Sequence, residues 1–378
     1  MFAAMGLGRF SYAAMVPAIV EAGYVSPVEA GFVGTANLAG FLIGAVASVP
    51  LARRFGRGLV LRAALLVCLA GLAASALPLG AVWLAGWRGL IGVATSLIMV
   101  LSLALIAETA PVDRRPAAAG FVFAGVGLGI SASGIAIPAL LAKGLAAAWT
   151  GVLCAGLVAA ALAFWGWRAD PAGSTKPAAA ATRLAQRTPI ATPALVRLML
   201  AHALFSFSIV PHTIYWVDYI ARGLALGPAI GGLHWTLVGL AAILGPLFTA
   251  MLARAIGTAA ALVVSFAILS IGIAAPALSP AAAVLVVSSL IFGAQPGVSS
   301  LMAARARDLG NPAEIPRVMR AMILANATGG VIGGLIAPWI YAGAFAAAAG
   351  PVVLFGVGAS AAALGALACL APGRRRAA

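Results

Sequence analysis

The sequence predicts an all-α membrane protein whose twelve transmembrane helices form two pseudo-symmetric six-helix bundles. Three observations predict this class: an apolar composition, a series of span-length apolar stretches, and an internal repeat. Hydrophobic residue types make up 63% of the 378 residues and charged types only 8%, whereas roughly a quarter of a soluble domain is charged. So few charged residues cannot cover a water-facing surface, and we exclude a soluble protein.

Apolar stretches of about 20 residues follow one another along the chain, and each is long enough to cross roughly 30 Å of hydrocarbon. Each should be helical, because lipid offers no partners to backbone polar groups. The alternating pattern of an outer-membrane barrel is absent from the sequence. We place the twelve spans at residues 1–20, 30–51, 59–79, 82–106, 117–141, 145–167, 196–219, 228–252, 258–278, 281–303, 318–342 and 351–370.

A break separates the sixth span from the seventh. Residues 168–195 are rich in Ala, Thr and Pro and contain no span-length apolar stretch, which is typical of a flexible linker. The sequence thus predicts an N-terminal six-helix half (1–167), a cytoplasmic linker (168–195) and a C-terminal six-helix half (196–378).

The basic residues indicate how the spans are oriented. When alternate loops are taken as cytoplasmic, that side holds nineteen of the 23 lysines and arginines. Only Lys143 and Arg222 lie on the other side, while Arg9 and Arg88 lie inside spans. By the positive-inside rule, both termini are cytoplasmic. The composition, rich in arginine and alanine, is typical of GC-rich bacterial genomes, so we expect a multi-pass protein of the bacterial inner membrane.

The two halves also repeat each other in sequence. Two six-span units in the same orientation form a parallel repeat, a design in which substrate binds near the membrane midplane between the halves. A shift of 201 residues matches Gly31 with Gly232, Thr35 with Thr236, Gly44 with Gly245, Arg53 with Arg254 and Gly56 with Gly257, and a shift of 200 matches Gly129 with Gly329 and Pro138 with Pro338.

The residues that follow the second span, 49–58, resemble the motif G-x-L-A-D-R-x-G-R-R/K of the major facilitator superfamily. The Leu-Ala pair, Arg54, Gly56 and Arg57 match, whereas Arg53 occupies the position of the family's aspartate. In the family that aspartate helps to latch the outward-facing state. The resemblance implies a cytoplasmic gating motif formed by Arg53, Arg54, Gly56 and Arg57 together with their repeat partners Arg254 and Gly257.

Two further segments, residues 8–12 and 123–130, resemble the YbfB/YjiJ-type subfamily. The resemblance to the superfamily covers the whole chain. It implies the major facilitator fold and secondary transport by alternating access.

Two arginines inside spans are candidates for a substrate site. Arg9 is predicted near the middle of the first span and Arg88 in the outer third of the fourth. A charge inside the membrane is costly, so each should face a partner or a watered cavity. Paired arginines suit a carboxylate or phosphate, because a guanidinium forks onto two oxygens. The alternatives are snorkelling for Arg9 and a structural hydrogen bond for Arg88. Tyr12, one turn after Arg9, should share its face.

Span 7 carries a cluster of one histidine and three aromatic residues, which helical spacing places on one face. This face could be a cavity wall whose histidine couples protons, or an aromatic belt at the outer membrane interface. The cluster consists of His212, Tyr215, Trp216 and Tyr219.

Asn37, Gln295 and Asn326 are polar side chains inside other spans. They could bind substrate or form hydrogen bonds between helices. His202 and His234 lie nearer the membrane edges and are weaker candidates.

Other classes of function find little support in the sequence. The three cysteines lie in apolar runs without metal-ligand spacing, so neither a disulfide nor a metal site is expected. No P-loop or catalytic motif is present, and we expect neither an enzyme nor a cofactor. The net charge of +15 sits in short loops, which argues against nucleic acid as a partner. We expect a monomer in the lipid bilayer.

The preferred hypothesis is a secondary active transporter of a small molecule, favouring an organic anion, with protons as the candidate driving ion. The acidic residues Glu21, Glu29 and Asp218 are predicted at span ends and the other five in the cytoplasm. A proton-linked exporter of amphipathic drugs, which usually needs a buried carboxylate, is the first alternative. A non-transporting membrane receptor or scaffold is the second.

Overall fold

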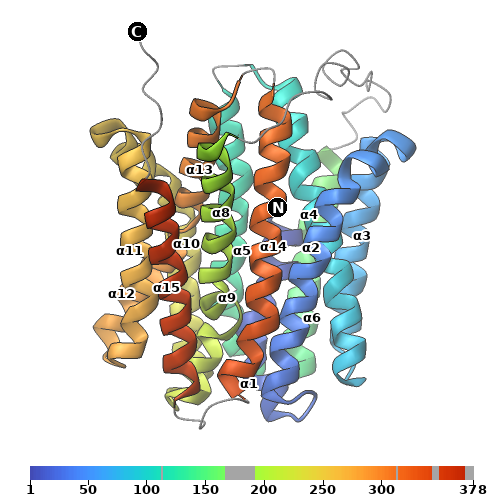
Figure 1. Ribbon diagram of the computed structural model, residues 1–378. Helices are drawn as coiled ribbons and strands as arrows, with labels where there is room; N and C mark the ends of the chain where they lie inside the picture. Colours follow the sequence, from blue (N-terminus) through green and yellow to red (C-terminus); the bar gives the residue numbers. More distant parts are fainter. Residues whose placement is uncertain (112–113, 167–191, 312–313, 343–348, 371–378) are drawn as a thin grey trace.

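The computed structural model describes residues 1–111, 114–166, 192–311, 314–342 and 349–370 and is helical throughout its spans (Figure 1). Most of the predicted linker, residues 168–191, lies outside the described residues. The first half contains the π-helix η1 (Phe2–Arg9), α1 (Ser11–Glu21), α2 (Pro27–Phe55), α3 (Arg57–Ser75), α4 (Gly80–Thr109), α5 (Arg115–Leu141) and α6 (Leu145–Gly166).

The second half contains the other six spans. It contains α8 (Pro193–Ser208), α9 (Val210–Asp218), the π-helix η3 (Tyr219–Gly223), α10 (Gly227–Ile256), α11 (Thr258–Leu278), α12 (Ala282–Gly293), α13 (Pro296–Leu309), α14 (Ile315–Ala342) and α15 (Gly350–Leu370).

Twelve helices in the described residues are long and apolar enough to cross a membrane, which confirms the predicted spans. The ninth coincides with its predicted limits, Thr258–Leu278, whereas the second and the seventh, Pro27–Phe55 and Pro193–Gly223, extend further at both ends. Ser26 caps the second span with a capping box, in which its hydroxyl accepts from the Glu29 N–H and the Glu29 carboxylate accepts from the Ser26 N–H. This pair satisfies backbone donors at the helix start.

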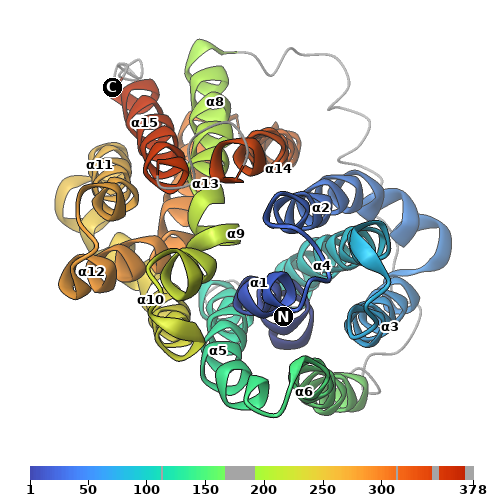
Figure 2. The same cartoon turned by 90° about the horizontal axis from the view of Figure 1, so that it is seen from below.

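The two halves meet along two helix pairs, α2 with α14 and α5 with α10, which Figure 2 shows side by side. Polar contacts support the seam: Thr35 Oγ1 donates to the Gly334 carbonyl at 2.6 Å, and Ser131 Oγ donates to the Thr236 carbonyl at 3.2 Å.

The ends of the bundle differ in how the halves meet. We call the end where α2 leads into α3, with Arg53, Arg54 and Arg57, the arginine end, and the opposite end the Asp218 end. At the Asp218 end α1 also packs on α9, whereas η1 and α8, the other segments of the same two spans, do not pack on each other. The halves are therefore closed together at the Asp218 end.

Three spans are interrupted: the first at Phe10, the seventh at Ile209 and the tenth at Ala294 and Gln295. Proline restarts the seventh and tenth, because Pro211 and Pro296 lie in the first turn of α9 and α13, where a missing N–H costs nothing. An interruption inside the membrane frees backbone carbonyls that must find other donors. Some of the polar side chains described below, such as Arg88, donate to these carbonyls.

Candidate functional site

Arg88 of α4 supplies hydrogen-bond donors to the backbone where the first span is interrupted. Its Nη1 donates to the Gly8 carbonyl at 2.6 Å and its Nη2 to the Arg9 carbonyl at 2.6 Å. The side chain is 1% exposed, and its guanidinium carbon lies 4.8 Å from the centroid of the Tyr12 ring. Arg88 therefore holds η1 and α1 together at their junction. This is the structural hydrogen bonding that the sequence leaves open as the alternative to substrate binding.

Asn37 and Tyr12 are also engaged with the backbone of the first half. Asn37 Nδ2 donates to the Arg88 carbonyl at 2.9 Å, and the Tyr12 hydroxyl donates to the Ala30 carbonyl at 2.8 Å. Both side chains are buried. Together with Arg88, they hold α1, α2 and α4 in register.

Arg9 differs from these neighbours because its guanidinium has no hydrogen-bond or ion-pair partner among the described residues. Its side chain is partly exposed, and its guanidinium carbon lies 5.0 Å from the Phe41 ring centroid and 5.3 Å from that of Phe10. Such cation–π contacts contribute about 0.5–2 kcal/mol, which does not replace the lost hydration of a charge inside a membrane. The donor edge of Arg9 is thus unpaired among the described residues.

His212 lies in a hydrogen-bonded network inside the second half, in which its Nδ1 has no partner among the described residues. Its Nε2 is 2.8 Å from Ser288 Oγ, and that hydroxyl donates to the Gly272 carbonyl at 2.7 Å. Since the single hydroxyl proton is committed to Gly272, Ser288 must accept from His212, which places the proton of His212 on Nε2. The ring of His212 is fully buried and packs on Trp216, Phe292 and Phe355.

Ser289 forms similar hydrogen bonds with the adjacent pair, Trp216 and His234. It donates to the Leu285 carbonyl and accepts from Trp216 Nε1 at 3.0 Å. His234 Nδ1 lies 2.9 Å from the same oxygen and must donate to it. His212 and Trp216 are therefore core residues of the second half, and neither the cavity wall nor the aromatic belt describes them.

Tyr215 departs from the predicted single face of span 7. His212, Trp216 and Tyr219 point into the second half, whereas the Tyr215 hydroxyl lies against Gly31 of the first half. The prediction of one shared face is wrong for this residue, because α9 is packed on both sides and its two faces meet different neighbours. Tyr215 is 1% exposed, and its ring stacks on that of Tyr341 with the ring centroids 4.2 Å apart. Its hydroxyl has no hydrogen-bond partner within the described part of the chain.

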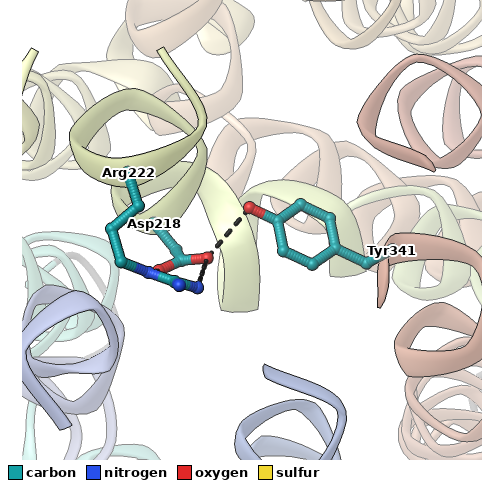
Figure 3. A network of polar contacts seen from close by, with 3 residues as sticks. All are labelled: Asp218, Arg222 and Tyr341. Carbon is teal, nitrogen blue, oxygen red and sulfur yellow. Dashed lines mark hydrogen bonds and ion pairs between the residues drawn. The ribbon is translucent and has the colours of Figure 1, made fainter. Parts of the chain in front are cut away.

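Asp218 corrects the expectation that no acidic group lies inside a span. Its side chain is 1% exposed, because the seventh span continues through η3 to Gly223. Arg222 donates to both carboxylate oxygens, at 2.6 and 2.7 Å, and the Tyr341 hydroxyl donates to Oδ2 at 2.9 Å (Figure 3). Among the described residues Asp218 is the one buried acid, and this network neutralises it.

Gln295 and Asn326 are partly exposed, and neither side chain has a hydrogen-bond partner in the described part of the chain. Gln295 lies at the interruption of span 10 but does not cap α13. Asn326 lies on α14, the helix that packs against both α2 and α8.

The residues of the predicted gating motif lie at the arginine end. Gly56 and Gly257 have nearly identical positive φ angles, +81° and +83°, a conformation that glycine adopts without a Cβ penalty. Both therefore make the same turn between consecutive spans. Arg57 Nη1 pairs with Glu108 Oε2 at 2.7 Å, tying this turn to α4. Arg53, Arg54 and Arg254 are exposed.

The structure thus brings together Arg9, Tyr12, Asn37 and Arg88 in the first half, and separates them from the network of His212 and Trp216. Sequence reasoning missed Asp218 as a buried group. The spacing of Asp218 and Arg222, i and i+4 on a helix, was the signal that could have revealed it.

Comparison with protein families identifies this architecture. A family model described as "Uncharacterised MFS-type transporter YbfB" matches residues 1–370. The chain belongs to this family of major facilitator transporters. No curated protein matches the sequence.

Solved transporter structures share the fold. A D-xylose–proton symporter superposes with a TM-score of 0.79 at 16% identity, covering 98% of this chain and 96% of that one. The peptide transporter POT in complex with sulfate gives a TM-score of 0.74 at 20% identity, with 98% and 92% covered. An inward-open xylose transporter, XylE from E. coli, gives 0.73 at 15% identity, with 97% and 93% covered. These likenesses are to the fold alone.

Proposed function

We propose that this protein is a secondary active transporter that moves a small organic anion across the bacterial inner membrane by alternating access. The family and the fold support secondary transport. The observation that carries the anion preference is Arg9, a guanidinium inside the bundle without a hydrogen-bond or ion-pair partner among the described residues. A carboxylate would supply the paired oxygens that its donor edge lacks.

The arrangement of the halves supports alternating access. α1 packs on α9 at the Asp218 end, and the hydrogen bonds of Thr35 and Ser131 join the halves along the seam. If the arginine end is cytoplasmic, as the positive-inside rule predicts, this is an inward-facing arrangement. Binding at Arg9 would then be reached from the cytoplasm.

Asp218 bears on the alternative of a proton-linked exporter of cationic compounds. Such an exporter needs a buried carboxylate, and Asp218 is buried. Both of its oxygens, however, accept from Arg222 or Tyr341, which leaves no unpaired charge for a cation. The geometry favours the anion transporter.

Flux into proteoliposomes tests these functions. The probes are labelled small carboxylates with and without a hydroxyl group, and tetraphenylphosphonium as the cation, each with and without a pH gradient. We expect saturable carboxylate flux that is lost in Arg9→Ala, partly kept in Arg9→Lys and unaltered in Lys143→Ala, which removes an exposed cation. Flux of the cation alone would support the exporter, and no flux would support a receptor or scaffold.

A further inference from the structure

Three polar side chains of the second half lie together without partners to saturate them. His202 and Ser206 occupy one face of α8, one turn apart, and Asn326 lies on the adjacent α14. His202 is 9% exposed, and its Nδ1 is buried without a hydrogen-bond partner. The side chains of Ser206 and Asn326 likewise have no hydrogen-bond partner among the described residues. This unsatisfied group, the α8–α14 cluster, belongs to none of the networks described above.

Contacts between α8 and α14 place the three side chains at one level. The ring of His202 lies near the backbone of Met322, which is one helical turn before Asn326. Ser206 Oγ lies against Gly330, one turn after Asn326. Along α14, Asn326 therefore lies between the residue near His202 and the residue near Ser206.

The ring of His202 has a defined hydrogen-bonding capacity. Nδ1 has no partner among the described residues, and it is an acceptor in the tautomer that carries the ring proton on Nε2. Nδ1 is then a lone pair that can only accept. A buried acceptor of this kind is costly to leave unpaired and calls for a hydroxyl or N–H donor.

The register of α2 and α14 places this cluster opposite Arg9. Continuing the register by one turn toward the arginine end puts Phe41 level with Ala327 and Asn326, and Phe41 is the ring that Arg9 covers. The contacts that define the register pair Gly31 with Pro338, Thr35 with Gly334, and Leu38 with Gly330.

We propose that the α8–α14 cluster binds the uncharged polar end of the anion whose carboxylate binds Arg9, and that the substrates are hydroxycarboxylates. The proposal rests on the proposed function and names its substrate class. The hydroxyl of the substrate donates to His202 Nδ1 and accepts from Ser206 or from the Asn326 amide. The two ends of one molecule then connect the two halves.

Matched pairs of carboxylates that differ by one hydroxyl test the proposal. The pairs are lactate and propionate, 3-hydroxybutyrate and butyrate, and 4-hydroxybenzoate and benzoate, used as competitors and as labelled substrates in proteoliposomes. We expect the full-length protein to prefer at least one hydroxylated member by about tenfold or more, because its analogue leaves buried polar groups unpaired.

Variants separate this inference from the function on which it rests. Asn326→Ala, Ser206→Ala and His202→Phe should each reduce the hydroxyl preference about five- to tenfold while flux of the hydroxyl-free analogue persists. Asn326→Asp keeps the side-chain volume and should weaken binding of both members by repulsion. Thr328→Ala, on an exposed position of the same helix, is the matched control.

The outcomes are distinguishable. Equal flux of both members of every pair, lost in Arg9→Ala, would overturn the subsite and leave the anion transporter intact. An undiminished preference in all three alanine or phenylalanine variants, with melting temperatures like that of the parent, would overturn it as well. Absence of saturable carboxylate flux in the parent protein would overturn both proposals.

Discussion

The first and second halves of the molecule repeat one six-span frame but arrange their internal polar groups differently. In the first half, Arg88 satisfies the interrupted backbone and leaves the neighbouring Arg9 with only aromatic contacts. In the second half, Ser288 and Ser289 accept hydrogen bonds from His212, Trp216 and His234, and Arg222 and Tyr341 neutralise Asp218, while the α8–α14 cluster is left without partners among the described residues. A buried network with every partner present stabilises a core, whereas an unpaired group in the same surroundings is costly and points to a ligand.

The contrast also separates structural from functional charges. Arg9 and Arg88 are adjacent in space and identical in chemistry, yet the backbone carbonyls engage only Arg88. Residue type alone would have given them the same role. The following predictions test this difference, from the largest expected effect to the smallest.

Arg88→Ala should be the most destabilising change. It removes two hydrogen bonds from a charged donor, each contributing about 1.5–3 kcal/mol, and leaves two buried carbonyls unpaired. We expect the unfolding free energy to fall by about 3–6 kcal/mol, measured by thermal or denaturant unfolding in detergent. Arg9→Ala is the matched control and should change stability little or raise it. Equal destabilisation by both variants would contradict the contrast between them.

Gly31→Ala should disturb the closed Asp218 end. A Cβ on Gly31 would collide with the Tyr215 hydroxyl and approach Pro338, so the halves must separate there. We expect a cysteine introduced on α9 near Tyr215 to react faster with a water-soluble thiol reagent, in a background without the native cysteines.

Tyr215→Phe removes the colliding oxygen and should partly restore protection in the Gly31→Ala protein. Gly58→Ala is the control, since a Cβ there meets no neighbour. Unchanged reactivity in Gly31→Ala would show that the end is not closed by this contact.

Arg222→Ala and Arg57→Ala compare the two ends of the bundle. Loss of Arg222 leaves the buried Asp218 carboxylate with Tyr341 alone, and we expect a cost of about 2–4 kcal/mol. Arg57 pairs with Glu108, whose side chain is 58% exposed, so its loss should cost about 1 kcal/mol or less. Unfolding measured at low and high salt would check this, because the exposed pair should be the more salt-sensitive.

His212→Phe should have the smallest effect. The replacement keeps an aromatic ring among aromatic neighbours and loses one neutral hydrogen bond, worth about 1 kcal/mol, while Ser288 still donates to Gly272. Flux and its pH dependence should match the parent protein. A folded variant whose flux has an altered pH dependence would instead indicate that His212 couples protons.

Much of the frame follows from the sequence alone. Span length and hydropathy are local properties, because each membrane helix satisfies its own backbone, and so twelve spans were predictable one at a time. The repeat that pairs Gly56 with Gly257 was readable in the sequence, and the two glycines have nearly identical φ angles in the structure. Arg9 and Arg88 were identified as candidates because a charged residue inside an apolar stretch stands out in the sequence.

Only the tertiary structure decided which of these polar groups is satisfied. Hydrogen bonding between spans depends on partners far away in sequence, such as Gly8 for Arg88, Ser288 for His212 and Tyr341 for Asp218, and no periodicity encodes those pairings. The level of His202, Ser206 and Asn326 opposite Arg9 likewise arises from the register of α2, α8 and α14. The sequence therefore determined the fold and the candidate charges, and the packing of the halves left Arg9 unpaired.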